Sequence, residues 1–107
     1  MADAAEEAAA ATEKANKKAL EYADVGLKAE QDFIKQREKL DIAKAKAAGK
    51  SEDEIFKIQQ KARASNIESL QRSYNEIKDL QSADAIEKAA SLKQQIKQII
   101  MMGKLLN

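Results

Sequence analysis

The chain turns back on itself at residues 47–54, which read Ala47-Ala48-Gly49-Lys50-Ser51-Glu52-Asp53-Glu54. Gly49 can adopt the left-handed backbone conformation that ends a helix. Ser51 can cap the next helix, and Glu54 stands three residues later, where a capping box requires an acid. Because a short loop between long helices makes them antiparallel neighbours, these residues predict a helical hairpin.

The composition on both sides of this turn favours helix over almost the whole chain. The 107 residues contain no Pro, Cys, His or Trp and only three glycines. Proline and glycine interrupt helices most strongly, so their scarcity predicts an all-α fold in a single domain. Alanine supplies much of the hydrophobic fraction of 44%. A monomer would therefore have a thin core, and we expect much of the burial to occur between chains.

The first arm of the hairpin has two parts. Residues 1–19 are rich in Ala, and four alanines share one helix face: Ala4, Ala8, Ala11 and Ala15. This segment is either a frayed helix or a surface that another helix approaches closely. Residues 20–48 are expected to form the first hairpin helix. Their apolar side chains recur at helical spacing in one wide stripe, which comprises Leu20, Gly26, Leu27, Phe33, Ile34 and Leu40.

The second arm is expected to be a single helix over residues 52–106, after a turn at residues 49–51. Its first apolar set forms the other side of the hairpin seam and comprises Ile67, Leu70, Tyr74 and Ile77. A later set is displaced by one residue in heptad phase, and the shift falls across residues 80–85. Either one helix continues with a local change of supercoil, or residues 81–84 break it and Ser82 or Asp84 caps a third helix. We favour the continuous helix.

The residue types that most catalytic sites need are absent from the sequence. Without His or Cys, the usual general bases, thiol nucleophiles and most metal ligands are missing. The acidic run Glu52-Asp53-Glu54 lacks the alternating oxygen ligands of a calcium loop, and it stands where a helix N-terminus favours negative charge. No glycine-rich phosphate-binding motif occurs. The sequence therefore predicts a protein that is not an enzyme and that holds no metal or cofactor.

The charge balance excludes a second class of function. Nineteen basic and 18 acidic residues give a net charge of +1. A chain so close to neutral, without clusters of aromatic and basic residues, is not expected to bind nucleic acid. The first residues carry acids where a secretory signal requires positive charge, and no stretch is apolar enough to span a membrane. We expect a protein that is cytoplasmic or exported by a route that needs no cleaved signal.

The C-terminal segment is the part of the sequence that most requires a functional explanation. Its large apolar residues point to several sides of a helix, more than one partner arm can cover. We interpret it as a surface buried between subunits. Docking within the hairpin is the plainer alternative, and contact with a membrane surface is the least favoured because aromatic anchors are absent. The expected assembly interface comprises Leu92, Ile96, Ile99, Ile100, Met101, Met102, Leu105 and Leu106.

A helical hairpin without Pro or Cys, with an Ala-rich polar start and an apolar C-terminal helix, resembles the needle and pilus subunits of type III secretion systems. The resemblance lies in the architecture, extends from about Leu20 to Leu106 and involves no diagnostic motif. It implies a structural subunit that self-assembles into a filament by stacking its C-terminal helix, with the chain ends in the wall or lumen of a tube.

The main alternative is a cytoplasmic coiled-coil adaptor or secretion chaperone, whose apolar stripes are covered by a helix of another protein. Self-assembly separates the two functions. A filament subunit polymerises, whereas an adaptor stops at a closed dimer or a one-to-one complex.

Overall fold

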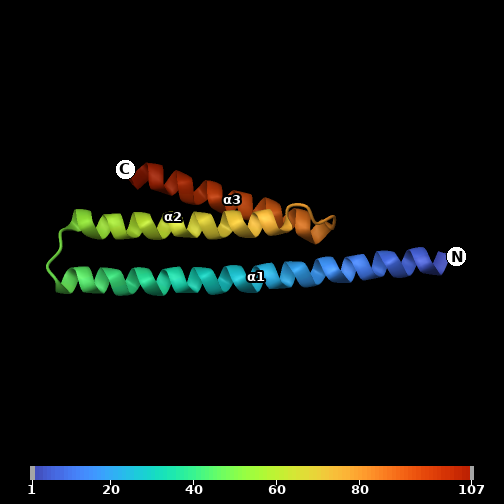
Figure 1. Cartoon of the computed structure of the whole chain (residues 1–107). Coiled ribbons are helices and arrows are strands. Elements are labelled where there is room, and N and C mark those ends of the chain that lie inside the picture. The colour runs from blue at the N-terminus through green and yellow to red at the C-terminus, as the bar shows by residue number, and fades with distance from the viewer. Residues whose placement is uncertain (1, 107) are drawn as a thin grey trace.

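Three long helices make up the chain. The computed structural model describes the backbone of residues 2–106 and the side chains of residues 4–105. Helix α1 spans Ala2–Ala47, α2 spans Glu52–Ile77 and α3 spans Ala83–Leu106. Figure 1 shows α2 running back along α1, and α3 running back along α2. No strand occurs in the described residues, and the expectation of an all-α fold built on an antiparallel hairpin is confirmed.

The turn between α1 and α2 ends the first helix with a left-handed glycine. Gly49 has a φ of 70°. The backbone N–H of Lys50 donates to the carbonyl of Ala45 at 2.9 Å, and that of Gly49 donates to the carbonyl of Lys46 at 3.1 Å. This pair of hydrogen bonds is the Schellman motif, which satisfies the last carbonyls of a helix. A side chain larger than hydrogen at residue 49 would be strained in this conformation.

Ser51 caps the N-terminus of α2. Its Oγ accepts a hydrogen bond from the backbone N–H of Glu54 at 3.3 Å. The Glu54 carboxylate lies 3.8 Å from the Nζ atom of Lys50. Glu52, Asp53 and Glu54 occupy the first turn of the helix, where the positive end of the helix dipole stabilises negative charge. The acidic run is thus part of the cap.

The second arm is broken, and the expectation of one continuous helix over residues 52–106 is wrong. Helix α2 ends at Ile77, and α3 begins at Ala83. The Oγ atom of Ser82 accepts a hydrogen bond from the N–H of Ala85 at 3.1 Å, so Ser82 caps the third helix. Leu80, within the connecting loop, packs against the core. The phase shift in the apolar pattern therefore marks a reversal of the chain, because the two apolar sets belong to helices that face each other.

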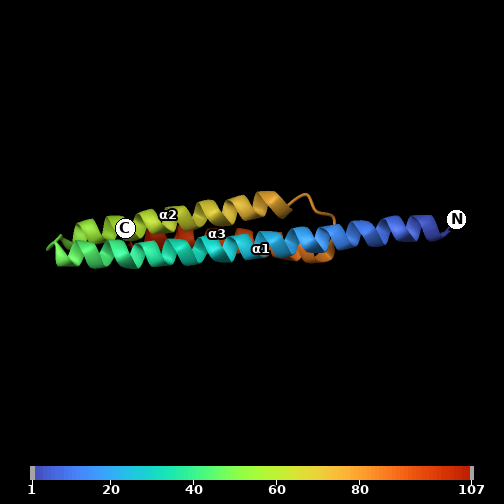
Figure 2. The ribbon, with the colours of Figure 1, turned by 60° about the horizontal axis from the view of Figure 1, so that its bottom comes forward.

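The core lies where the three helices meet. Leu27 of α1, Leu70 and Ile77 of α2, and Leu92 of α3 are at most 6% exposed and form one cluster. Figures 1 and 2 together show α3 lying along one side of the α1–α2 pair. Partly buried apolar residues surround the cluster: Leu20, Ala23, Tyr74, Leu80, Ala89, Ile96 and Ile99. Full burial of a side chain of this size contributes about 1.5–3 kcal/mol to folding.

Helix α1 is much longer than its two neighbours. Its 46 residues rise about 69 Å, and the chain measures 72 × 24 × 13 Å. In Figure 1 the N-terminal part of α1 projects past the loop between α2 and α3. The side chains of residues 4–15 are exposed. The Ala-rich segment therefore continues α1 as a helix but has no packing partner within the described chain.

Candidate assembly surfaces

The seam between α1 and α2 contains most of the residues that the sequence assigns to it. Leu27, Leu70 and Ile77 are buried. Four further seam residues are partly buried: Leu20, Ile34, Ile67 and Tyr74. Tyr74 also contacts α3, because the Nζ atom of Lys93 lies 5.4 Å from the centroid of its ring. The seam thus continues from the hairpin into the third helix.

Phe33 and Leu40 do not belong to this seam, contrary to the interpretation of the sequence. Their side chains are 65% and 52% exposed. Phe33 precedes Ile34 by one residue, which turns its side chain about 100° around the helix axis. It therefore lies at the exposed edge of the seam beside α2 and not inside the seam. Tyr22 and Val25 share the same side of α1 and are 75% and 67% exposed. We call these four residues the distal face of α1.

Tyr22 and Val25 are exposed apolar residues that the pattern of a single apolar stripe does not identify. Leu20, Leu27 and Ile34 already account for the amphipathic character of α1, and they are buried or partly buried. The signal that could have found the distal face is the absence of charge from a second row of positions on the same helix.

The C-terminal end of α3 carries a second exposed apolar surface. Ile100, Met101, Met102 and Leu105 are 42%, 62%, 59% and 83% exposed. We call these four residues the C-terminal patch. All four belong to the expected assembly interface, whereas the side chain of Leu106 lies outside the described residues. Large apolar side chains exposed together are typical of contact surfaces between proteins.

Three other residues of the expected assembly interface lie within the fold of the single chain. Leu92 is fully buried in the core cluster, and Ile96 and Ile99 pack against that cluster. The assignment of Leu92 to an interface between subunits is wrong because α3 folds back onto α2 and the chain itself covers this stripe. Of the residues assigned to that interface, those of the C-terminal patch remain exposed.

Ion pairs join the helices at the rim of the core. The Nζ atom of Lys88 on α3 lies 2.9 Å from Oδ1 of Asp24 on α1, and the Nζ atom of Lys28 lies 3.2 Å from Oδ2. The side-chain hydrogen bond from Lys88, and then that from Lys28, lowers the pKa of Asp24. On the α1–α2 side, Arg72 donates a hydrogen bond of 2.7 Å to the carboxylate of Glu30.

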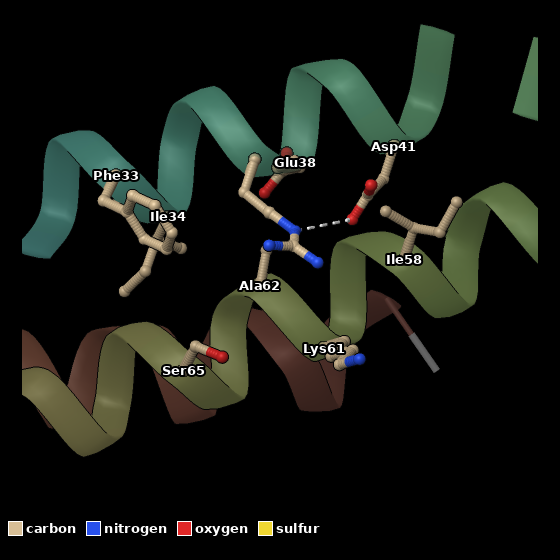
Figure 3. A pocket seen from close by; sticks show the side chains of 9 residues that line it. Phe33, Ile34, Glu38, Asp41, Ile58, Lys61, Ala62 and Ser65 are labelled. Atoms are coloured by element: carbon tan, nitrogen blue, oxygen red, sulfur yellow. Dashed lines mark ion pairs between the residues drawn. The ribbon is translucent and has the colours of Figure 1, made fainter. Parts of the chain in front are cut away.

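A groove of about 380 Å³ lies between α1 and α2. Figure 3 shows the side chains that line it. They are Phe33, Ile34, Arg37, Glu38 and Asp41 of α1, and Ile58, Lys61, Ala62 and Ser65 of α2. The dashed line in Figure 3 marks the ion pair in which Nε of Arg37 lies 3.8 Å from Oδ2 of Asp41. The charged residues that line the groove are two cations and two anions, of which Arg37 and Asp41 form this ion pair.

Nowhere in the described part of the chain do three or more Asp, Glu, His or Cys side chains gather so as to hold a metal ion. None of the helices, over the same residues, combines the length and the apolar character needed to cross a bilayer.

Comparisons with other proteins do not connect this chain to a family. No family model, no curated protein and no solved structure matches it. The distal face and the C-terminal patch are therefore the observations from which a function can be proposed.

Proposed function

We propose that this protein is a structural subunit that self-assembles into a helical oligomer or filament. One observation carries the proposal: two separate apolar surfaces, the distal face and the C-terminal patch, are exposed on one rod-shaped chain. Burial of apolar surface against another protein contributes about 25 cal/mol per Å² removed from water. A subunit that binds one neighbour through each of two surfaces can add further subunits repeatedly.

The projecting part of α1 supports the same proposal. Residues 4–15 form a helix whose side chains are all exposed. Helices in proteins gain most of their stability from packing against other elements, and a neighbouring subunit would supply that packing here. Among helical assemblies, the needle-like or pilus-like filament that the sequence resembles is the form that we propose.

A coiled-coil adaptor or secretion chaperone would cover the same surfaces with a helix of a different protein. The two functions differ in the behaviour of the purified chain. An adaptor alone would remain a monomer or a closed dimer at every concentration, whereas a filament subunit would form assemblies that grow with concentration.

Charged substitutions in the C-terminal patch test the proposal. The double variant Met101→Glu/Leu105→Glu should stay folded, because both side chains are exposed, and should lose the higher assemblies. Ile86→Glu is the matched control, since Ile86 is 66% exposed on the same helix but belongs to neither surface. Negative-stain microscopy and light scattering compare both variants with the parent. Assemblies that persist unchanged in the double variant would contradict a role of the patch.

A further inference from the structure

A row of twelve uncharged residues follows α1 along the distal face and its N-terminal continuation. The spacing alternates between three and four residues, which is the heptad pattern of a helix that packs against another helix. None of the twelve is Asp, Glu, Lys or Arg, although these types make up 35% of the chain. All are exposed except Ala19, which is partly buried. We call them the distal row: Ala5, Ala8, Thr12, Ala15, Ala19, Tyr22, Gly26, Ala29, Phe33, Gln36, Leu40 and Ala43.

We propose that the distal row pairs with the distal row of a second copy of this chain, in antiparallel orientation, around a two-fold axis near Asp24 and Val25. The inference rests on the proposed function, because it names one of the contacts through which subunits would assemble. It also commits the distal row to the chain itself and not to a different protein. The C-terminal patch then remains free to join one such dimer to the next.

The area of the distal row suits a dimer only if the whole row takes part. A strip about 57 Å long and about 10 Å wide on each copy amounts to about 1,100 Å² for both copies, close to the lower limit of about 1,200 Å² for stable interfaces. The part from Tyr22 to Leu40 alone supplies about half of that area. The Ala-rich start of α1 must therefore be included, and this explains why it continues as a helix beyond the rest of the fold.

One antiparallel register places bulky side chains against small ones. In it, Tyr22 of one copy lies opposite Gly26 of the other. Phe33 then faces Ala15, and Leu40 faces Ala8. The remaining layers pair residues of similar size: Thr12 with Gln36, Ala19 with Ala29, and Ala5 with Ala43. Alternation of large and small residues across an interface lets two helices approach closely without leaving voids.

Gly26 has no structural explanation within the single chain. It lies inside α1, its φ is not positive, and a Cβ atom built on it would meet no atom within 4 Å. A glycine in a helix interior destabilises the helix relative to alanine. The second copy supplies a reason, because a glycine leaves space in which the exposed ring of Tyr22 can lie against the helix backbone.

Charges beside the distal row favour the same register. Lys18 lies opposite Asp32 of the second copy, and the symmetry forms this pair twice. Within the described part of the chain, neither residue forms an ion pair. Residues 2–24 contain six acids and three bases, whereas residues 25–47 contain six bases and four acids. Antiparallel pairing brings these oppositely charged halves of α1 together.

Neighbouring arrangements lose these features. If one copy of α1 slides by seven residues along the other in one direction, Lys18 comes to lie opposite Lys39 of the second copy. If it slides by seven residues in the other direction, Gly26 comes to lie opposite Ala15. A parallel pair in register places Gly26 against Gly26 and joins the two acidic ends of α1. The antiparallel register therefore satisfies size and charge together.

Single cysteines test the register, because the chain has none of its own. Each is introduced into the Met101→Glu/Leu105→Glu variant, and a short bis-maleimide cross-links the protein at concentrations where light scattering shows dimers. Val25→Cys should form cross-linked dimers, since the two-fold axis brings the two copies of residue 25 together. Leu40→Cys alone should give at least tenfold less product, and mixing it with Ala8→Cys should restore the product. Ile86→Cys, away from the distal row, is the matched control and should give none.

The outcomes separate this inference from the proposed function. If Leu40→Cys alone gives as much cross-linked product as the mixture, the two copies pair in parallel and the inference is overturned. A double variant that stays monomeric while the parent assembles would also overturn it and would leave self-assembly standing. A parent that is monomeric at every concentration would contradict both. As a second readout, Gly26→Leu should weaken dimerisation at least tenfold without loss of helicity, and unchanged dimerisation would contradict the register.

Discussion

Asp24 on α1 and Lys88 on α3 form an ion pair of 2.9 Å that ties the first helix to the third. The pair lies at the rim of the cluster in which Leu27 and Leu92 meet. The two side chains are 33% and 38% exposed, and an ion pair in such a position contributes less than about 1 kcal/mol. Burial of Leu92 therefore stabilises the packing of α3, and the ion pair orients it.

Acid should remove the contribution of this ion pair to the free energy of unfolding. The hydrogen bond from Lys88 lowers the pKa of Asp24 in the folded chain. The ionised Asp24 therefore stabilises the fold fully at pH values above 3.8, the pKa of its carboxyl in the unfolded chain. This stabilisation is lost as the pH falls through the lower pKa of the folded chain. We expect Asp24→Asn to reduce the free energy of unfolding by less than about 1 kcal/mol at neutral pH and to have no effect once the carboxyl is protonated. Urea denaturation followed by circular dichroism measures this difference, with Asp79→Asn in the exposed loop as control. A difference that does not change with pH would contradict the assignment.

Leu92→Ala should destabilise the single chain by about 2–5 kcal/mol, because it leaves a cavity in the core. Ile86→Ala on the same helix should change stability by less than about 0.5 kcal/mol, since Ile86 is exposed. Denaturation at several protein concentrations measures both variants. A loss that appears only at concentrations where the protein assembles would show that Leu92 is an interface residue and not a core residue.

Substitution by alanine should change the stability of the fold in opposite directions at Gly49, in the turn after α1, and at Gly26, inside α1. Gly49→Ala should destabilise the fold by about 1–2 kcal/mol, because residue 49 has a φ of 70°. Gly26→Ala should stabilise the monomer by about 0.8–1 kcal/mol, because its Cβ meets nothing within the chain and alanine favours helix. Thermal denaturation at low protein concentration separates them. The same sign for both variants would contradict the account of these positions.

The parts of the fold that local chemistry decides could be predicted from the sequence. Gly49 and Ser51 act through hydrogen bonds to residues three to five positions away, so their roles can be recognised in a short stretch of sequence. The all-α class follows in the same way from the scarcity of helix-breaking residues. These features do not depend on how the helices pack.

The remainder depends on tertiary packing, which a linear pattern does not specify. The phase shift near residue 80 is visible in the sequence, but whether it bends or breaks the helix depends on the cap at Ser82 and the packing of Leu80 on the core. Leu92 could be placed in the core only once α3 was known to fold back. The sequence pattern places Phe33 and Leu40 in the same stripe as Ile34, because a wide stripe does not show where one face of a helix ends and the next begins.

The weight-average molar mass of the purified parent chain, measured by light scattering over a wide range of concentrations, tests the proposed self-assembly most directly. Self-assembly predicts a mass that rises with concentration from that of the 11.8 kDa chain through the dimer to larger assemblies. Met101→Glu/Leu105→Glu should stop at the dimer. A mass that stays at 11.8 kDa at every concentration would contradict the proposal that this chain is a self-assembling subunit.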